Sequence, residues 1–393
     1  MPSWNVHFGL AVKHDDRELI RLIERAHALS SMIREVPIPP HVQTELDAIN
    51  IMRAVRGTTV IEGAQASTEE VLKIIAAPNE ISLPKSRERD EQEIKNANTV
   101  MLFVAYAINR RPDLPVNQKL ICLLHKLTTS DIEYPNNVPG EYRSHPVSAG
   151  DYLPPASGEE VRRLMSEFSD WLNSPPVMNW DPILRALAAH FYLVSIHPFG
   201  DGNGRTSRAV ESLLLYQGNV NARGFYSLAN YYYEHRSDYV WHLNHARYNP
   251  ENDLTDFVLF GSRGLVKELE GVYDQVLNEV KLISYRDYAR ETFQRTNGLG
   301  LRTKGGERLF HFLIGLGREP ILMSQLTDKK SRAGTIYGKV SLRTIQRDIA
   351  FLREHDLIKV EDGAIVANLD VMDQFTARHE FNRFFEEQPD ITS

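Results

Sequence analysis

The sequence predicts a mainly helical protein with more than one domain, and three observations lead to this expectation. Apolar residues recur at helical spacing in long stretches, as in residues 15–34, where Leu19, Ile23 and Ala26 fall on one face. Strand-like patterns are short, and the clearest is a hairpin pattern over residues 357–366. A chain of 393 residues is also too long for one small core, so two or three domains are expected.

The first part of the chain, residues 1–110, is expected to be a helical region. The helix over residues 15–34 should stop at the proline-rich residues 37–40, because proline cannot continue a helix. A second helix is expected over residues 42–56, and a third should start after Ser67, which is followed by Glu69 and Glu70. Residues 84–93 are dense in charge and indicate a solvated connector or an exposed helix, and residues 99–107 indicate a buried one.

The middle of the chain predicts two buried helices joined by a polar loop. A helix over residues 115–129 comes first, and its His125 is expected to be structural. Asp181 and Pro182 form a helix start, and the apolar residues that follow predict a buried helix that ends near His197. A further helix is expected over residues 206–217, before Gly218. Residues 253–265 indicate one more apolar helix that closes this domain.

The loop between the two buried helices carries the clearest chemistry. Residues 197–208 read His-Pro-Phe-Gly-Asp-Gly-Asn-Gly-Arg-Thr-Ser-Arg. The three glycines, Gly200, Gly202 and Gly204, let backbone N–H groups converge on an anion, and the start of the following helix adds unpaired donors and a positive dipole end. The segment therefore predicts a phosphate site.

Four side chains of the same loop suit a nucleoside triphosphate. Asp201 supplies one oxygen ligand, which fits a Mg²⁺ ion held mainly by phosphates and water. Arg205 and Arg208 lie three residues apart on a helix and offer guanidinium groups to phosphate oxygens. His197 has an unperturbed pKa near neutrality, which suits a general base. Phe199 and His190 are expected to pack in the core.

The loop resembles the motif of the Fic (Fido) family, His-x-Phe-x-[Asp/Glu]-Gly-Asn-Gly-Arg-x-x-Arg, and matches it at every defined position. The resemblance implies a mainly α Fic fold with a β-hairpin flap and a protein adenylyltransferase activity that uses Mg-ATP. It implies that Asn203 and the loop amides contact the α- and β-phosphates, that Arg205 holds the β- and γ-phosphates, and that Arg208 holds the γ-phosphate. A glycine-rich turn that only caps a helix is the structural alternative.

Upstream of the loop, residues 58–63 read Thr-Thr-Val-Ile-Glu-Gly. The pattern Ser/Thr-x-x-x-Glu-Gly/Asn is similar to the inhibitory helix of one Fic class, in which the glutamate pairs with the last arginine of the motif. The resemblance implies that Glu62 pairs with Arg208 and inhibits the enzyme. The alternative is a surface glutamate before a C-cap glycine, Gly63.

Two further parts of the site follow only from the resemblance. Residues 138–155 resemble the flap that aligns the acceptor by adding a strand to it, with a plain surface hairpin as the alternative. Residues 227–247 are rich in aromatic side chains and resemble the region that lines the adenine pocket. Tyr239 is then the expected stacking contact, and an aromatic core helix is the competing interpretation.

The end of the chain predicts a smaller, basic domain. Helices are expected over residues 308–316, 320–329 and 341–355, followed by the hairpin pattern. This order looks like a winged helix-turn-helix domain, with Arg343 and Arg347 together on the exposed face of the last helix. Residues 302–359 hold 12 Lys/Arg and 6 Asp/Glu, a local charge of +6 within a chain of net charge −7. DNA and protein are both open as partners of this domain.

Composition and the absence of long apolar runs indicate the cellular compartment that we expect for the protein. The single cysteine, Cys122, excludes an internal disulfide framework and indicates a reducing compartment. The first residues lack the basic and apolar order of a signal peptide, and no apolar run approaches the length of a membrane span, so we expect a cytoplasmic protein without a membrane partner.

These expectations combine into one prediction. The domains are residues 1–110 with the inhibitory motif 58–63, a Fic catalytic domain at 111–270, a helical linker at 271–300, a winged helix at 301–375 and a tail at 376–393. The function is transfer of AMP from Mg-ATP to a Ser, Thr or Tyr hydroxyl of an acceptor protein, which can be the chain itself, and a homodimer is open. The alternatives are removal of AMP, transfer of another nucleotidyl or phosphoryl group, and a DNA-binding regulator that senses nucleotide.

Overall fold

The computed structural model describes residues 7–9, 11–13, 15–221, 228–249, 251–295, 303–316, 320–328, 330–338 and 340–375. The chain forms two compact units that divide between Gln275 and Val276. The expected tail at 376–393 and most of the stretch between residues 295 and 303 lie outside the described residues. Each unit is described on its own below.

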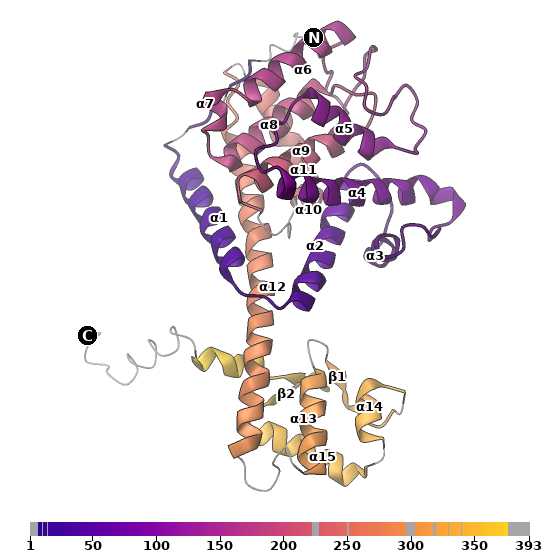
Figure 1. Ribbon diagram of the computed structural model, residues 1–393, viewed down its shortest axis with the longest axis vertical. Helices are drawn as coiled ribbons and strands as arrows, with labels where there is room; N and C mark the ends of the chain where they lie inside the picture. The colour runs from indigo at the N-terminus through magenta and orange to yellow at the C-terminus, as the bar shows by residue number, and fades with distance from the viewer. Residues whose placement is uncertain are drawn as a thin grey trace, which may run out of the picture. The chain divides into compact units, whose positions relative to one another are not determined.

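The first unit is helical (Figure 1), and side-chain caps define several of its helix starts. Asp16 caps the first helix through bonds to the N–H groups of Glu18 and Leu19, and Ser67 forms a capping box with Glu70. Asp181 caps the eighth helix, with Pro182 in its first turn. The elements in chain order are α1 Arg17–Glu35, α2 Pro40–Val60, α3 Thr68–Ala76, η1 Lys85–Arg87, α4 Glu88–Arg110, α5 Gln118–Thr129, α6 Gly158–Leu172, α7 Pro175–Met178, α8 Pro182–Ile196, α9 Asn203–Gln217, α10 Leu228–Glu234, α11 Arg236–Tyr248 and α12 Thr255–Arg295.

Helices α8 and α9 form the centre of this unit. Every residue of α8 from Ala186 to Ile196 is buried, and α9 is buried from Arg205 to Leu215. A helix that is apolar on all sides belongs inside a core. Helices α4 and α5 pack on α9, α6 packs on α8, and α2 packs on α10 and α4. The loop between α8 and α9 is therefore held by a fully packed pair of helices.

The second unit begins in the last part of α12 and has its own apolar core. Its elements are α13 Lys304–Leu316, β1 Ile321–Leu322, η2 Met323–Leu326, α14 Arg332–Tyr337, α15 Leu342–Glu354, β2 Ile358–Glu361, β3 Ala364–Ala367 and η3 Leu369–Phe375. The strands form an antiparallel sheet in the order β1-β3-β2, in which Val360 faces Ile365 across the hairpin. This order of helices and hairpin agrees with the expected winged helix, which stays a prediction.

The structure corrects three expected elements. Residues 320–328 are not a continuous α-helix: Ile321 and Leu322 pair with Ile365 and Ala364, and a short 3-10 turn follows. Helix α9 starts at Asn203, three residues before the expected start. Helix α12 does not end near residue 265 but continues to Arg295. Residues 84–93, expected as a connector or an exposed helix, contain a short 3-10 turn and then the start of α4.

The expected β-hairpin flap is reduced to one antiparallel bridge between Ala149 and Tyr152. Their backbones exchange two hydrogen bonds of 2.9 and 3.2 Å. Prolines at positions 139, 146, 154 and 155 lack the N–H group that a longer ladder would need. A short turn, residues 149–152, therefore stands where the sequence predicts two strands.

Candidate active site

His197 ends helix α8 in an unusual conformation. It lies in the left-handed region with φ 51° and ψ 58°, while its N–H still donates to the carbonyl of Leu193. A residue with a side chain adopts this region only where its surroundings enforce it, and such residues cluster at functional sites. The turn stops α8 and directs the imidazole into the cavity described below.

The imidazole of His197 has a defined tautomer. Its Nδ1 lies 3.1 Å from the carbonyl oxygen of Val194. A carbonyl only accepts, so Nδ1 carries the proton and Nε2 keeps its lone pair. Burial lowers the pKa of His197 to about 4. The hydrogen bond to Val194 opposes this shift, whereas the positive charge of Arg247 also lowers the pKa. His197 is therefore neutral near pH 7 and can accept a proton at Nε2.

The loop after His197 is fixed by its own residues and by α5. The side-chain amide of Asn203 accepts from Phe199 N–H and donates to Phe199 C=O, both at 2.9 Å. The ring of Phe199 is fully buried and stacks on His125 with a centroid distance of 3.7 Å. Asn137 accepts a 3.0 Å bond from the N–H of Asp201. The loop is preformed before any ligand binds.

His125 is structural, as expected from the sequence. Its Nδ1 accepts from Gly140 N–H at 2.9 Å, so Nε2 carries the proton and donates to the carbonyl of Asp201 at 3.0 Å. Burial lowers the pKa of this imidazole to about 4. A neutral ring with one donor and one acceptor thus joins α5, the Gly140 turn and the loop.

Arg143, which the sequence reasoning did not single out, fastens the loop from the other side. Its guanidinium is buried and donates to the carbonyl oxygens of His197 at 2.7 Å, His145 at 2.8 Å and Pro155 at 2.6 Å. Its own N–H donates to the carbonyl of Pro198 at 2.9 Å. Arg143 therefore ties residues 143–155 to both residues of the His-Pro step, to His197 through its side chain and to Pro198 through its backbone.

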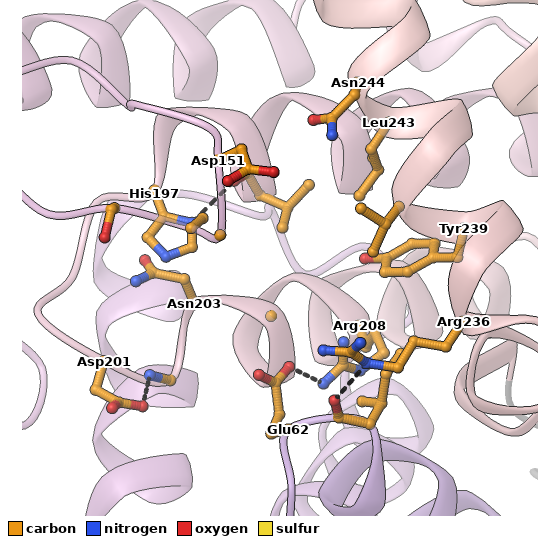
Figure 2. A pocket seen from close by; sticks show the side chains of 18 of the residues that line it. Glu62, Asp151, His197, Asp201, Asn203, Arg208, Arg236, Tyr239, Leu243 and Asn244 are labelled. Carbon is orange, nitrogen blue, oxygen red and sulfur yellow. Dashed lines mark hydrogen bonds and ion pairs between the residues drawn. The ribbon is translucent and has the colours of Figure 1, made fainter.

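A cavity of about 470 Å³ opens in front of this loop (Figure 2). This volume falls in the range of small-molecule sites. Its walls come from four places: the loop from His197 to Gly204 with Arg208, the end of α2, the turn at residues 148–151, and one face of α11. The α11 residues are Arg236, Tyr239, Val240, Leu243, Asn244 and Arg247.

Arg208 is buried in the cavity wall, and its guanidinium already has hydrogen-bond partners within the protein. Its Nη2 lies 2.6 Å from Oε1 of Glu62, as Figure 2 shows, and 3.1 Å from the carbonyl oxygen of Thr58. Its Nε donates to the hydroxyl of Thr58 at 2.9 Å. Burial works to raise the pKa of Glu62, but the charges of Arg208 and Arg205 outweigh it and hold that pKa below its ordinary value. Glu62 is therefore a carboxylate, and it forms an ion pair with Arg208.

Arg205 is placed differently from Arg208. Its guanidinium donates to the hydroxyl of Tyr134 and to Oδ1 of Asp201, both at 2.9 Å, and lies 3.4 Å from Glu93. Burial would lower the pKa of Arg205, but Glu93 and Tyr134 raise it. Arg205 is not among the described residues that line the cavity. Its predicted contact with the β- and γ-phosphates stays a prediction.

Asp201 is the side chain that fits a metal ion. It lines the cavity, and its side chain is 39% exposed, although Oδ1 also accepts from Gly202 N–H at 2.5 Å. Among the described residues no three His, Cys, Asp or Glu side chains gather into a cluster that could hold a metal alone. One accessible carboxylate fits Mg²⁺ that arrives with its phosphates and keeps several waters.

The middle of the chain is similar to a known family. Residues 115–215, which run from just before α5 to near the end of α9, match the family described as the Fic/DOC family.

Relatives and solved structures agree with this assignment. The chain is 29% identical over 252 residues to the protein adenylyltransferase Fic of Aedes aegypti, which covers 63% of this chain and 46% of that protein. For the protein of the same name from Drosophila virilis the identity is 30%, with 63% of this chain and 47% of that protein covered. The chain thus spans about half the length of the curated relatives it matches.

Two solved structures share the fold. A Fic family protein from Desulfovibrio desulfuricans G20 aligns with a TM-score of 0.55 at 17% identity and covers 90% of this chain and 93% of that one. Fic-1 from C. elegans aligns with a TM-score of 0.54 at 24% identity and covers 67% and 73% of the two chains.

The α11 wall of the cavity contains residues that the sequence reasoning missed. Tyr239 was singled out, and it does line the cavity, but its hydroxyl lies 2.8 Å from Nε2 of His190 and its ring stacks on Tyr232. Leu243 and Arg247 follow at helical spacing, and both face the cavity. The spacing of four residues between these three positions was a signal that could have found them.

His190 is packed in the core of the first unit, as expected from the sequence. It is fully buried between the Tyr239 hydroxyl and the carboxylate of Glu211, which lies 2.7 Å from its Nδ1. It does not line the cavity.

In the second unit, Arg343 and Arg347 are both exposed on α15, and Arg347 also contacts Asp348 at 3.2 Å. Among the described residues, no helix is both long enough and apolar enough to cross a membrane.

Proposed function

We propose that the protein is an adenylyltransferase that moves AMP from Mg-ATP to a Ser, Thr or Tyr hydroxyl of a protein. The observation that carries the proposal is the free Nε2 of His197 beside the N-terminus of α9, on the wall of one cavity. The printed name of the relatives, protein adenylyltransferase Fic, supports the same reaction.

The residues divide the work of binding and proton transfer. N–H groups in the first turn of any α-helix lack intrahelical acceptors, and those of α9 point toward the loop, so they and Arg208 suit the phosphate chain. Asp201 would hold Mg²⁺, which neutralises charge on the phosphates when it is bound. Tyr239, Val240 and Leu243 give an apolar wall for the base.

The chemical step needs one base. His197 Nε2 takes the proton of the acceptor hydroxyl, the hydroxyl oxygen forms a bond to the α-phosphorus, and the bond from that phosphorus to pyrophosphate breaks. Pyrophosphate leaves with the electron pair. The imidazole can accept the proton because its Nδ1–H is already fixed on Val194.

We also propose that Glu62 inhibits this reaction. A γ-phosphate that binds Arg208 must replace the Glu62 carboxylate or lie beside it. Two unit charges about 4 Å apart interact by about 4 kcal/mol at an effective dielectric constant of about 20, before desolvation is counted. That energy is sufficient to misplace the triphosphate.

One experiment tests both proposals. The Glu62→Gly variant is incubated with Mg-ATP and cell lysate, and modified proteins are analysed by mass spectrometry. We expect a mass increase that corresponds to AMP on a hydroxyl residue of an acceptor or of the chain itself. An increase corresponding to a phosphoryl group or another nucleotide would replace the proposed reaction by that one.

Glu62 also favours a second reaction of the same site, removal of AMP from a modified protein. Its side chain is 36% exposed in the cavity that holds His197, so a water molecule between them could be oriented toward phosphorus. Release of AMP from a modified acceptor by the wild type, with loss of this release in Glu62→Gly, would identify this activity.

The second unit supports a proposal of another class. Exposed Arg343 and Arg347 on α15 suit DNA phosphates or base edges, and the unit would then act as a DNA-binding regulator. An electrophoretic shift with promoter DNA, with and without ATP, tests this proposal. We keep the domain bounds of the sequence analysis, a homodimer and a cytoplasmic location as proposals; the single cysteine supports the last of these.

A further inference from the structure

Arg247 is a buried cation in the cavity wall without a carboxylate partner. Its guanidinium is about nine-tenths buried, and within the described parts of the chain no Asp or Glu oxygen lies within 4.0 Å of it. Burial lowers its pKa, as expected for a charge that neutral groups surround. Such a placement costs stability, so the contacts that Arg247 does make call for an explanation.

Those contacts converge on the short turn at residues 149–152. The guanidinium carbon lies 3.9 Å from the centre of the Tyr152 ring, a stacked cation–π geometry. The Nε of Arg247 donates to the hydroxyl of Ser195 at 2.9 Å, and the hydroxyl of Tyr152 donates to the carbonyl of the same Ser195 at 2.8 Å. Arg247, Tyr152 and Ser195 thus close a clasp among α11, the turn and the end of α8.

The clasp acts beside the reacting atoms. Ser195 lies two residues before His197, and Gly150 and Asp151 of the held turn line the cavity. Figure 2 shows Asp151 and His197 on the same side of that cavity. Within the turn, the backbone ladder is a single bridge, and Gly150 lies at φ 61°.

We propose that Arg247 is a positioning residue: it locks residues 149–152 onto the end of α8, so that this turn forms a fixed edge against which the acceptor segment lies as its hydroxyl reaches His197. The inference rests on the proposed function, because it concerns the acceptor of that reaction. The planar guanidinium is required, since one face stacks on Tyr152 while Nε and Nη1 bond to Ser195 and Asn244.

The decisive variant is Arg247→Lys, made in the full chain with and without Glu62→Gly. Lysine keeps the positive charge near His197 but cannot stack and bond in the same way. Tyr152→Phe keeps the ring under the guanidinium and removes only the bond to Ser195. Arg263→Lys is the matched control, because Arg263 pairs with Glu18 away from the cavity lining.

The first measurement is hydrogen exchange of the turn. We expect peptides that contain Ala149 and Tyr152 to exchange at least tenfold faster in Arg247→Lys and to a smaller extent in Tyr152→Phe, while α8 and α9 keep their protection. Unchanged exchange in the turn, or equal loss in Arg263→Lys, would overturn the clasp.

The second measurement separates the acceptor from the nucleotide. With α-labelled ATP and Mg²⁺ we expect the ratio of protein-bound label to free AMP to fall at least tenfold in the Arg247→Lys variant of Glu62→Gly. The Kd for Mg-ATP, measured by calorimetry, should stay within threefold. Two results would contradict the acceptor role. One is faster hydrogen exchange in the turn with an unchanged ratio of protein-bound label to free AMP. The other is weaker binding of Mg-ATP while the turn keeps its protection from exchange. If Glu62→Gly itself gives neither protein-bound label nor AMP, the proposed function fails, whereas the exchange experiment still decides the clasp.

Discussion

Two walls of the cavity are held in different ways. The loop from His197 to Gly204, the preformed wall, is fixed by groups that no ligand has to displace, among them His125, Asn137 and Arg143. In the other wall, Glu62 at the end of α2 pairs with Arg208, the guanidinium that we propose holds a phosphate. On that proposal this second wall, the competing wall, opposes nucleotide binding. Changes to the first should therefore remove activity, and changes to the second should release it.

The largest effect is expected for the preformed wall. His197→Ala removes the base and should lower transfer from α-labelled ATP by about 10³-fold, within the range of general-base contributions. Binding of Mg-ATP should be retained, because the amides and Arg208 remain. Transfer at the wild-type rate would refute the assignment of His197.

A change in the competing wall should raise the activity instead of lowering it. Glu62→Gly leaves Arg208 without its carboxylate, and auto-labelling should rise by about 10- to 100-fold, below the limit set by an interaction of about 4 kcal/mol. Initial rates with labelled ATP measure it. If the rate of this variant does not rise, Glu62 is not inhibitory.

Two buried histidines of the preformed wall and its support should make the stability of the protein depend on pH. The pKa values of His125 and His197 are about 4 in the folded chain, below the ordinary 6.5. As the pH falls below 6.5, these two histidines become protonated in the unfolded chain but stay neutral in the folded chain. The free energy of unfolding therefore decreases between pH 6.5 and pH 4. At pH 4.5 each histidine accounts for about 2 kcal/mol.

This contribution is separated from that of the carboxylates by a variant. Urea unfolding of wild type and His197→Ala is compared at pH 7 and pH 4.5, and the variant should lose about 2 kcal/mol less between the two. An equal loss in both proteins would show that the imidazole is not held neutral.

The smallest effect concerns the support of the ion pair. Thr58→Val removes the acceptor of Arg208 Nε but leaves Glu62 in place, so auto-labelling should rise about two- to fivefold. Thr59→Val is the control, because the Thr59 hydroxyl bonds within α2 to the carbonyl of Val55. Equal changes in both variants would assign the effect to α2 as a whole.

The sequence predicted the parts of this structure that local rules determine. Caps at Ser67 and Asp181 defined helix starts, because a cap is a contact within three residues. The motif placed His197, Asp201 and the glycines on one loop.

Contacts over long sequence distances were beyond such rules. Arg205 and Arg208 are three residues apart, yet Arg205 turns to Glu93 and Tyr134, whose positions depend on how α4 packs. Arg143 carries no local pattern, because its partners lie in other segments, and the helical spacing that places Arg247 on the cavity face does not reveal its bond to Ser195. The local sequence predicts a helix at residues 321–322, but in the structure they form a strand because they pair with β3.

Gly204 links the two walls. A side-chain carbon at this position would collide with Oε1 of Glu62 and lie 3.1 Å from Nη1 of Arg208. On the proposed function, the space through which phosphate oxygens would approach the start of α9 is the same space that admits the glutamate. A larger residue at position 204 that displaced Glu62 would then also obstruct the nucleotide, so we expect release from inhibition to arise through α2 rather than through the catalytic loop.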